Sequence, residues 1–159
     1  MDFRKPVVQD GAALYQLAKR SGNLDVNSCY HYVLLCEKFS ETCVVAVDKD
    51  EPVGFITGFR DPKRQDHLFI WQIAVSEHKR KQGIARSMLN HLLRRDYDPE
   101  FQFIETTISP SNAASEALFR SLASDLQCEI TVQNYFDEKL FNESGHEEEP
   151  LFRIGPLNP

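Results

Sequence analysis

The chain has 159 residues, 42% of them hydrophobic and 26% charged, which fits one globular domain with a single core. Its formal net charge of −6 disfavours a nucleic-acid-binding protein, which normally presents a basic face. No apolar run approaches the ~20 residues that a membrane span requires, and the first residues lack the apolar core of a signal peptide. We therefore expect one domain over residues 1–159, located in the cytoplasm.

The N-terminal half predicts a strand, two helices and an antiparallel meander. Asp10 is expected to cap the first helix, and Asn27 or Ser28 the second. The second helix is expected to bury an apolar stripe of Tyr30, Val33, Leu34 and Phe39. The expected elements are a strand at 3–7, a helix at 10–20, a helix beginning near 28, and strands at 42–47, 53–59 and 68–75.

The C-terminal half predicts two further helices that alternate with strands. The first is expected to bury Ile84, Met88, Leu89, Leu92 and Leu93, and the second Ala113, Ala117, Leu118 and Leu122. The expected elements are a helix from 84, a strand at 101–108, a helix at 112–122, a strand at 128–133, a polar loop at 136–150 and a strand at 151–154. The resulting order, β-α-α-β-β-β-α-β-α-β-β, predicts a mixed sheet with helices on both faces.

Cysteine and histidine spacing gives no sign of a metal site. The four cysteines form no C-x-x-C pair, and the five histidines are scattered. We expect reduced, mostly buried thiols and no bound metal.

The stretch from Leu68 to Arg86 is typical of an anion site. An apolar strand ends at charged residues, and Gly83 then stands at the mouth of an amphipathic helix. The first N–H groups of a helix lack internal partners, the helix dipole favours negative charge there, and glycine lets a phosphate approach the backbone. Arg80 and Lys81 add positive charge, and Ala85 is small. The alternative is a surface turn in which the glycine only shapes the chain.

The spacing Arg80-x-x-Gly83-x-Ala85 resembles the acetyl-CoA pyrophosphate loop of the GNAT N-acetyltransferase superfamily. The resemblance implies an α/β GNAT fold, a mixed and mostly antiparallel sheet with a splayed central strand pair, and acetyl-CoA as cosubstrate. It also implies that Val75 donates its N–H to the thioester carbonyl, a contact worth ~3 kcal/mol for the oxyanion that forms there. The implied cofactor-binding residues are Ile73, Ala74, Val75, Arg80, Lys81, Gln82, Gly83, Ile84, Ala85, Arg86 and Asn112.

Asn112 stands where a second strand ends and a helix begins. Its amide offers both donors and an acceptor, which suits the pantetheine arm of coenzyme A; alternatively, Asn112 or Ser111 simply caps the helix. Many GNAT enzymes have a tyrosine seven residues later that protonates the leaving thiolate, but here that residue is Phe119, expected in the core. Tyr30 or a water replaces it, or no acid is needed, because a thiol pKa of ~8.5 makes a fair leaving group.

Three further side chains indicate an acceptor pocket. Strand alternation places Trp71 on the face of Ile73 and Val75. Asp25 precedes the second helix, and Glu149 ends an acidic run. The alternatives are a core tryptophan, a carboxylate that stabilises a helix start, and a solvated acidic loop.

Longer strings are similar to the L-2,4-diaminobutyrate acetyltransferases of ectoine biosynthesis. The resemblance implies acetylation of the γ-amine of diaminobutyrate, in a homodimer. Asp25 and Glu149 would bind the ammonium groups, and Tyr30 would hydrogen-bond or relay a proton, so that it counts with Val75 and Trp71 as catalytic. Trp71 would meet a cation with its π face, and amides near Asn27 would take the carboxylate. The matching strings are residues 24–30, 42–45, 53–58, 69–75 and 105–115.

Two other functions fit the same motifs. One is a GNAT enzyme for another amine, such as a polyamine, a peptide N-terminus or an aminoglycoside. The other is a non-catalytic acyl-CoA-binding module, which the phenylalanine at position 119 would suit.

Overall fold

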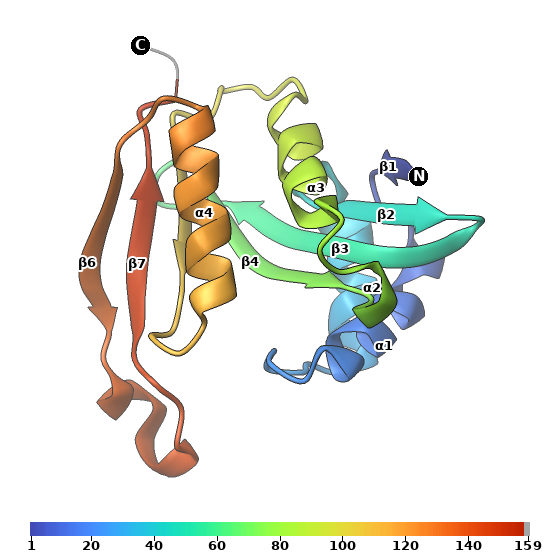
Figure 1. The fold of residues 1–159 in the computed structure, drawn as a ribbon, viewed down its shortest axis with the longest axis horizontal. Helices are drawn as coiled ribbons and strands as arrows, with labels where there is room; N and C mark the ends of the chain where they lie inside the picture. Colours follow the sequence, from blue (N-terminus) through green and yellow to red (C-terminus); the bar gives the residue numbers. More distant parts are fainter. Residues whose placement is uncertain (158–159) are drawn as a thin grey trace. The chain divides into compact units, whose positions relative to one another are not determined.

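The structure, a computed structural model, describes residues 1–157, except the side chain of residue 143. Its helices and strands follow the predicted order throughout (Figure 1). The elements are β1 (Asp2–Arg4), α1 (Gly11–Ser21), α2 (Cys29–Lys38), β2 (Val44–Asp48), β3 (Glu51–Arg60), β4 (His67–Val75), α3 (Ile84–Leu93), β5 (Phe103–Thr107), α4 (Ala113–Asp125), β6 (Ile130–Phe136) and β7 (Glu149–Ile154).

Within the described residues, seven strands form a sheet in the order β1-β2-β3-β4-β5-β7-β6. The pairs β1–β2, β2–β3, β5–β7 and β6–β7 are antiparallel, whereas β4 and β5 are parallel. The parallel ladder is short, from His67–Phe103 to Phe69–Glu105. The predicted fold class, a mixed and mostly antiparallel sheet with helices, is confirmed.

Contacts divide the chain into two compact units. The first comprises Met1–Phe59 and Ile70–Asp96, and the second comprises Arg60–Phe69 and Tyr97–Pro159. β4 therefore begins in the second unit and ends in the first. The single domain expected over residues 1–159 stays a prediction.

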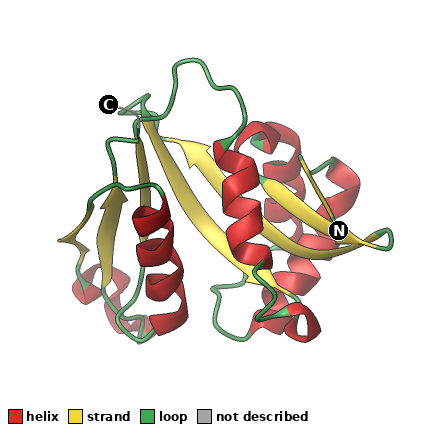
Figure 2. Ribbon diagram, turned by 45° about the horizontal axis from the view of Figure 1, so that its top comes forward, coloured by secondary structure: helices red, strands yellow, loops and turns green. Residues whose placement is uncertain are grey.

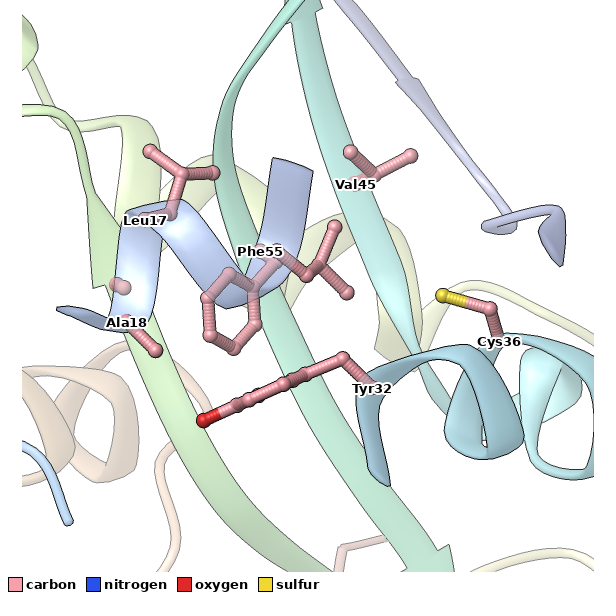
Figure 3. Packing of buried hydrophobic residues seen from close by; sticks show 8 residues of the cluster. Leu17, Ala18, Tyr32, Cys36, Val45 and Phe55 are labelled. Atoms are coloured by element: carbon pink, nitrogen blue, oxygen red, sulfur yellow. The ribbon is translucent and has the colours of Figure 1, made fainter. Parts of the chain in front are cut away.

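In the first unit, helices pack on both faces of the strands (Figure 2). On one face, α1 and α2 bury a cluster in which the ring of Tyr32 meets Phe55 edge to face, with centroids 6.0 Å apart (Figure 3). On the other face, Met88 of α3 lies over Gly54, where an added Cβ would be 3.2 Å from the methionine Cε. Two helical layers thus fix the strands that carry the site.

The buried face of α2 differs from the prediction. Tyr32, Leu35 and Cys36 are buried, whereas Tyr30 and the other apolar residues expected inside lie at the surface or, for Val33, half-buried. The side chain of Ser28 accepts a hydrogen bond from the N–H of His31, so Ser28, not Asn27, caps the helix. This helix is apolar on more than one face, and its packing against α1 determines which face is buried.

Smaller differences concern the other helices. Asp10 precedes α1 but makes no side-chain cap there; its carboxylate instead binds the Arg4 guanidinium and the N–H of Val7, 2.7 Å away. In α4, Phe119, Leu122 and Ala123 are buried, while the two alanines expected inside are exposed. Leu118, also expected inside, is half-buried, so the buried face of α4 is centred on Phe119, Leu122 and Ala123. In α3 the prediction is confirmed except at Leu93, which is half-buried.

The second unit contains the start of β4 with β5, β7, β6 and α4. The ends of the predicted loop at 136–150 are wrong, because Phe136 still belongs to β6 and Glu149 already begins β7. Arg153 and Glu105, opposite each other on β7 and β5, form an ion pair at 2.8 Å. This ion pair therefore supports the register between β5 and β7.

Candidate active site

β4 presents two faces of different character. Ile70, Gln72 and Ala74 are buried, whereas Trp71, Ile73 and Val75 are accessible to different degrees, with Trp71 45% exposed. The predicted alternation is confirmed, and the interpretation of Trp71 as a core residue is wrong. Because the side chain of Ala74 belongs to the core cluster, only its backbone is available to a ligand.

The loop before α3 has the backbone expected of an anion site. Lys81 and Gly83 both have positive φ, 62° and 74°, and among residues 1–157 no side chain caps the first turn of α3. A Cβ placed on Gly83 would have no described neighbour within 4 Å. The first N–H groups of the helix therefore have no side-chain cap from the described residues, which suits phosphate binding.

The other loop residues differ in what they offer. Lys81 and Gln82 are exposed, Ala85 and Arg86 are half-buried, and Ile84 is buried. The burial of Ile84 anchors the start of α3 in the core, so this residue contributes only its backbone. A rigid helix start keeps its N–H groups oriented.

Arg80 connects this loop with the end of β4. Its Nε donates to the carbonyl oxygen of Val75 at 3.3 Å, and Nη2 reaches that of Ser21 at 3.5 Å. A cavity of about 330 Å³ lies here, and its lining includes Arg20, Ser21, Val75, Glu77 and Arg80. Two cationic side chains thus stand close to the C-terminal end of the strand.

The loop before α2 is attached to β4 by a buried polar network. The Gln72 Nε2 donates to the carbonyl oxygen of Asp25 at 2.8 Å, and the Tyr32 hydroxyl donates to the Gln72 Oε1 at 2.9 Å. The N–H of Asn27 points to the same hydroxyl at 3.5 Å. The structure therefore brings Asp25 and Asn27 to the strand that carries Trp71.

Sequence reasoning missed Gln72 and Tyr32. The available signal was a polar residue at an inward position of an otherwise apolar strand. A buried amide needs hydrogen-bond partners, and such a residue indicates a fixed contact whose partner the sequence does not identify.

Aromatic rings surround Trp71. His31 meets the indole edge to face at 4.9 Å, and Phe59 does so at 6.1 Å. Burial lowers the pKa of His31, so the imidazole is neutral at pH 7, and within residues 1–157 its Nε2 has no hydrogen-bond partner. Tyr30, one residue earlier, is 72% exposed, which leaves its hydroxyl accessible.

Asn112 and Glu149 belong to the second unit. The Asn112 Oδ1 accepts from the N–H of Ser115 at 3.2 Å, so the residue does cap α4, with its amide NH₂ left for other contacts. Glu149 Oε1 accepts from the Thr107 hydroxyl at 3.3 Å, and the Ser111 hydroxyl donates to Glu147. These bonds fasten the acidic segment to the end of β5 and to the loop that precedes α4.

Phe119 is 2% exposed, as expected for a core residue. Its ring has no proton to donate. Any acid that assists thiolate departure must therefore be another group.

Three further features concern possible metal ligands, the cysteine thiols and the length of the helices. Among the described residues, no group of three or more His, Cys, Asp or Glu side chains is arranged to bind a metal. All four cysteines are free. Within the same residues, no helix has the length and hydropathy needed to cross a membrane.

The chain matches the model of the Acetyltransferase (GNAT) family over residues 11–123. It is 51% identical over 157 residues to the L-2,4-diaminobutyric acid acetyltransferase of Shouchella clausii, covering 99% of this chain and 88% of that protein. The corresponding enzyme of Marinococcus halophilus is 50% identical over 155 residues, covering 98% and 90%.

Among solved structures, the diaminobutyrate acetyltransferase EctA from Paenibacillus lautus, in complex with its substrate L-2,4-diaminobutyric acid and coenzyme A, superposes with a TM-score of 0.95. It is 41% identical, and the match covers 99% of this chain and 96% of that one. The chain is an acetyltransferase and belongs to the GNAT family.

Proposed function

We propose that this enzyme transfers the acetyl group of acetyl-CoA to the γ-amine of L-2,4-diaminobutyrate, the step that supplies the precursor of ectoine. The observation that carries the proposal is the similarity over 99% of the chain to a protein crystallised with diaminobutyric acid and coenzyme A. A homodimer is part of the proposal and rests on the family resemblance, and a location in the cytoplasm is proposed with it.

The first unit fits the cosubstrate. The uncapped start of α3 and the open space at Gly83 suit a diphosphate, and Lys81 and Arg86 add positive charge. Acetyl-CoA supplies an activated acyl group. In this proposal, the backbone of residues 73–75 aligns the pantetheine arm, and the Val75 N–H binds the carbonyl oxygen where negative charge develops.

The amine requires a different set of groups. A primary ammonium with a pKa of ~10.4 must lose a proton before it can attack. In this proposal, Asp25 binds an ammonium group, and the exposed Tyr30 hydroxyl relays the proton. Trp71 offers an exposed indole face to a cation. The roles of Asn112 as a cofactor contact and of Glu149 as a substrate contact stay predictions from the sequence.

A thiol-release assay with diaminobutyrate, ornithine, lysine and putrescine tests the substrate. We expect diaminobutyrate to react fastest, and mass spectrometry should locate the acetyl group on the γ-nitrogen. Equal rates across the four amines would contradict the substrate assignment. Binding of acetyl-CoA without release of thiol would instead indicate a non-catalytic module.

A further inference from the structure

The segment at residues 22–28 has no helix or strand of its own, yet it carries Asp25 and Asn27. Two of its hydrogen bonds reach buried side chains of other elements: the Gln72 amide donates to the carbonyl oxygen of Asp25, and the N–H of Asn27 points to the Tyr32 hydroxyl. Leu24 adds a partly buried contact with the core cluster. Two buried side chains outside the segment, Gln72 and Tyr32, therefore help to hold Asp25 and Asn27 in place.

Gln72 is fixed in a single orientation. It is 5% exposed, and its Oε1 accepts from the Tyr32 hydroxyl while its Nε2 donates to the main chain. A flipped amide would turn the NH₂ group toward the Tyr32 hydroxyl and set its oxygen against the carbonyl oxygen of Asp25, which cannot donate. The backbone N–H of Gln72 is also bonded, to the Thr57 hydroxyl at 3.2 Å.

Tyr32 is fixed as firmly. Its side chain is fully buried and touches the rings of Phe55, Tyr15 and His31, with centroids 6.0, 6.3 and 5.0 Å away. The hydroxyl can therefore serve as a rigid reference point for both Gln72 and Asn27.

We propose that Gln72, supported by Tyr32, is a positioning residue for the amine substrate. Gln72 follows Trp71 directly and points to the opposite face of β4. The strand that carries the indole thus also holds the Asp25 segment, through the next residue along the chain. Gln72 sets the place of Asp25 and Asn27 relative to Trp71 without touching the substrate. This inference rests on the proposed function, since it assumes that these residues bind the amine.

Steady-state kinetics of Gln72→Met and Tyr32→Phe provide the first test. Each variant keeps the volume of the side chain and removes one hydrogen-bonding group. Each variant loses two hydrogen bonds of the network that connects the segment to β4 and α2. We expect the KM for diaminobutyrate to rise about tenfold, while the KM for acetyl-CoA changes less than about twofold. An equal change in both constants, or no change in either, would overturn the proposal.

Thr42→Val is the matched control. The Thr42 hydroxyl is buried and donates to the Gly58 carbonyl oxygen at 2.7 Å in the same unit, so the variant loses a similar bond away from the segment. Both KM values should stay at the wild-type level. A rise in the amine KM as large as that of Gln72→Met would mean that general loosening explains the effect.

Hydrogen–deuterium exchange gives a readout that needs no substrate. In Gln72→Met the amides of residues 22–28 should exchange faster than in the wild type, while those of β2 and β3 should not. If the wild type fails to acetylate diaminobutyrate, the proposed function fails, and exchange still decides whether Gln72 holds the segment. If Gln72→Met cannot be purified, Tyr32→Phe carries both measurements, and unchanged exchange would contradict the proposal.

Discussion

The imidazole of His31 meets the indole of Trp71 edge to face, with ring centroids 4.9 Å apart. His31 comes from α2 and Trp71 from β4, so the contact joins the helix that follows the Asp25 segment to the strand that precedes the loop before α3. Phe59 of β3 supports the indole at 6.1 Å. The ring is held by neighbours and still 45% exposed, a combination that suits a wall for a cationic substrate.

Replacement of Trp71 by leucine should weaken amine binding. Loss of a cation–π contact worth about 1–2 kcal/mol raises the KM for diaminobutyrate by about tenfold. The KM for acetyl-CoA should stay constant. Phe39→Leu, at an aromatic residue that is 40% exposed in the same unit, serves as control. Wild-type kinetics in Trp71→Leu would remove the indole from the site.

Stability should fall in mild acid because of His31 and His91. Burial lowers the pKa of both residues, and for His91 the charges of Arg95 and Arg94 lower it further. The unfolded chain then binds protons more readily than the folded one, so the stabilisation is complete above pH ~6.5 and is lost as the pH falls below it. Urea unfolding at pH 7.5, 6.5 and 5.5 measures the free energy of unfolding at each pH. The decline should shrink in a His31→Gln/His91→Gln variant, and an unchanged decline would assign it to other groups.

Gly83→Val should impair the use of acetyl-CoA. The position has a φ of 74° and open space around it, so the new side chain strains the backbone by about 1–2 kcal/mol and occupies the room expected for the diphosphate. Gly145→Val is the control, because Gly145 has a φ of 76° and is equally open. Both variants should lose similar stability, and only Gly83→Val should raise the KM for acetyl-CoA. Equal KM values would count against the phosphate site.

Gly11→Ala tests the packing that sets the position of α2. An added Cβ would lie 2.5 Å from Cγ2 and 2.8 Å from Cα of Val33, so the backbones of α1 and α2 would have to separate. We expect the free energy of unfolding to fall by about 3 kcal/mol. Gly22→Ala would meet none of the described residues within 4 Å, so only the positive φ of 78° opposes it, at a cost nearer ~1 kcal/mol. Similar losses would mean that the helices adjust freely.

Local sequence patterns predicted the element order and the backbone of the loop before α3 because both depend on near neighbours. The alternation in β4 and the spacing of α3 are examples, and Gly83 has the positive φ that the loop requires. The buried face of α2 was wrong because its sequence is apolar on more than one side. The contacts of Gln72 join residues 40 and 47 positions apart, and no local period reports such a pairing.

Phe119→Tyr tests whether a tyrosine at this position, as in many GNAT enzymes, can protonate the leaving thiolate in this enzyme. The ring is 2% exposed within the second unit, so a new hydroxyl would enter an apolar core and cost about 1–3 kcal/mol if it finds no partner. We expect a lower melting temperature and no gain in kcat. Tyr30→Phe should instead lower kcat with little loss of stability, because its 72% exposed hydroxyl contributes little to packing. A higher kcat in Phe119→Tyr would mean that an acid at position 119 assists the reaction. An unchanged kcat in Tyr30→Phe would mean that the proton donor is a group other than Tyr30.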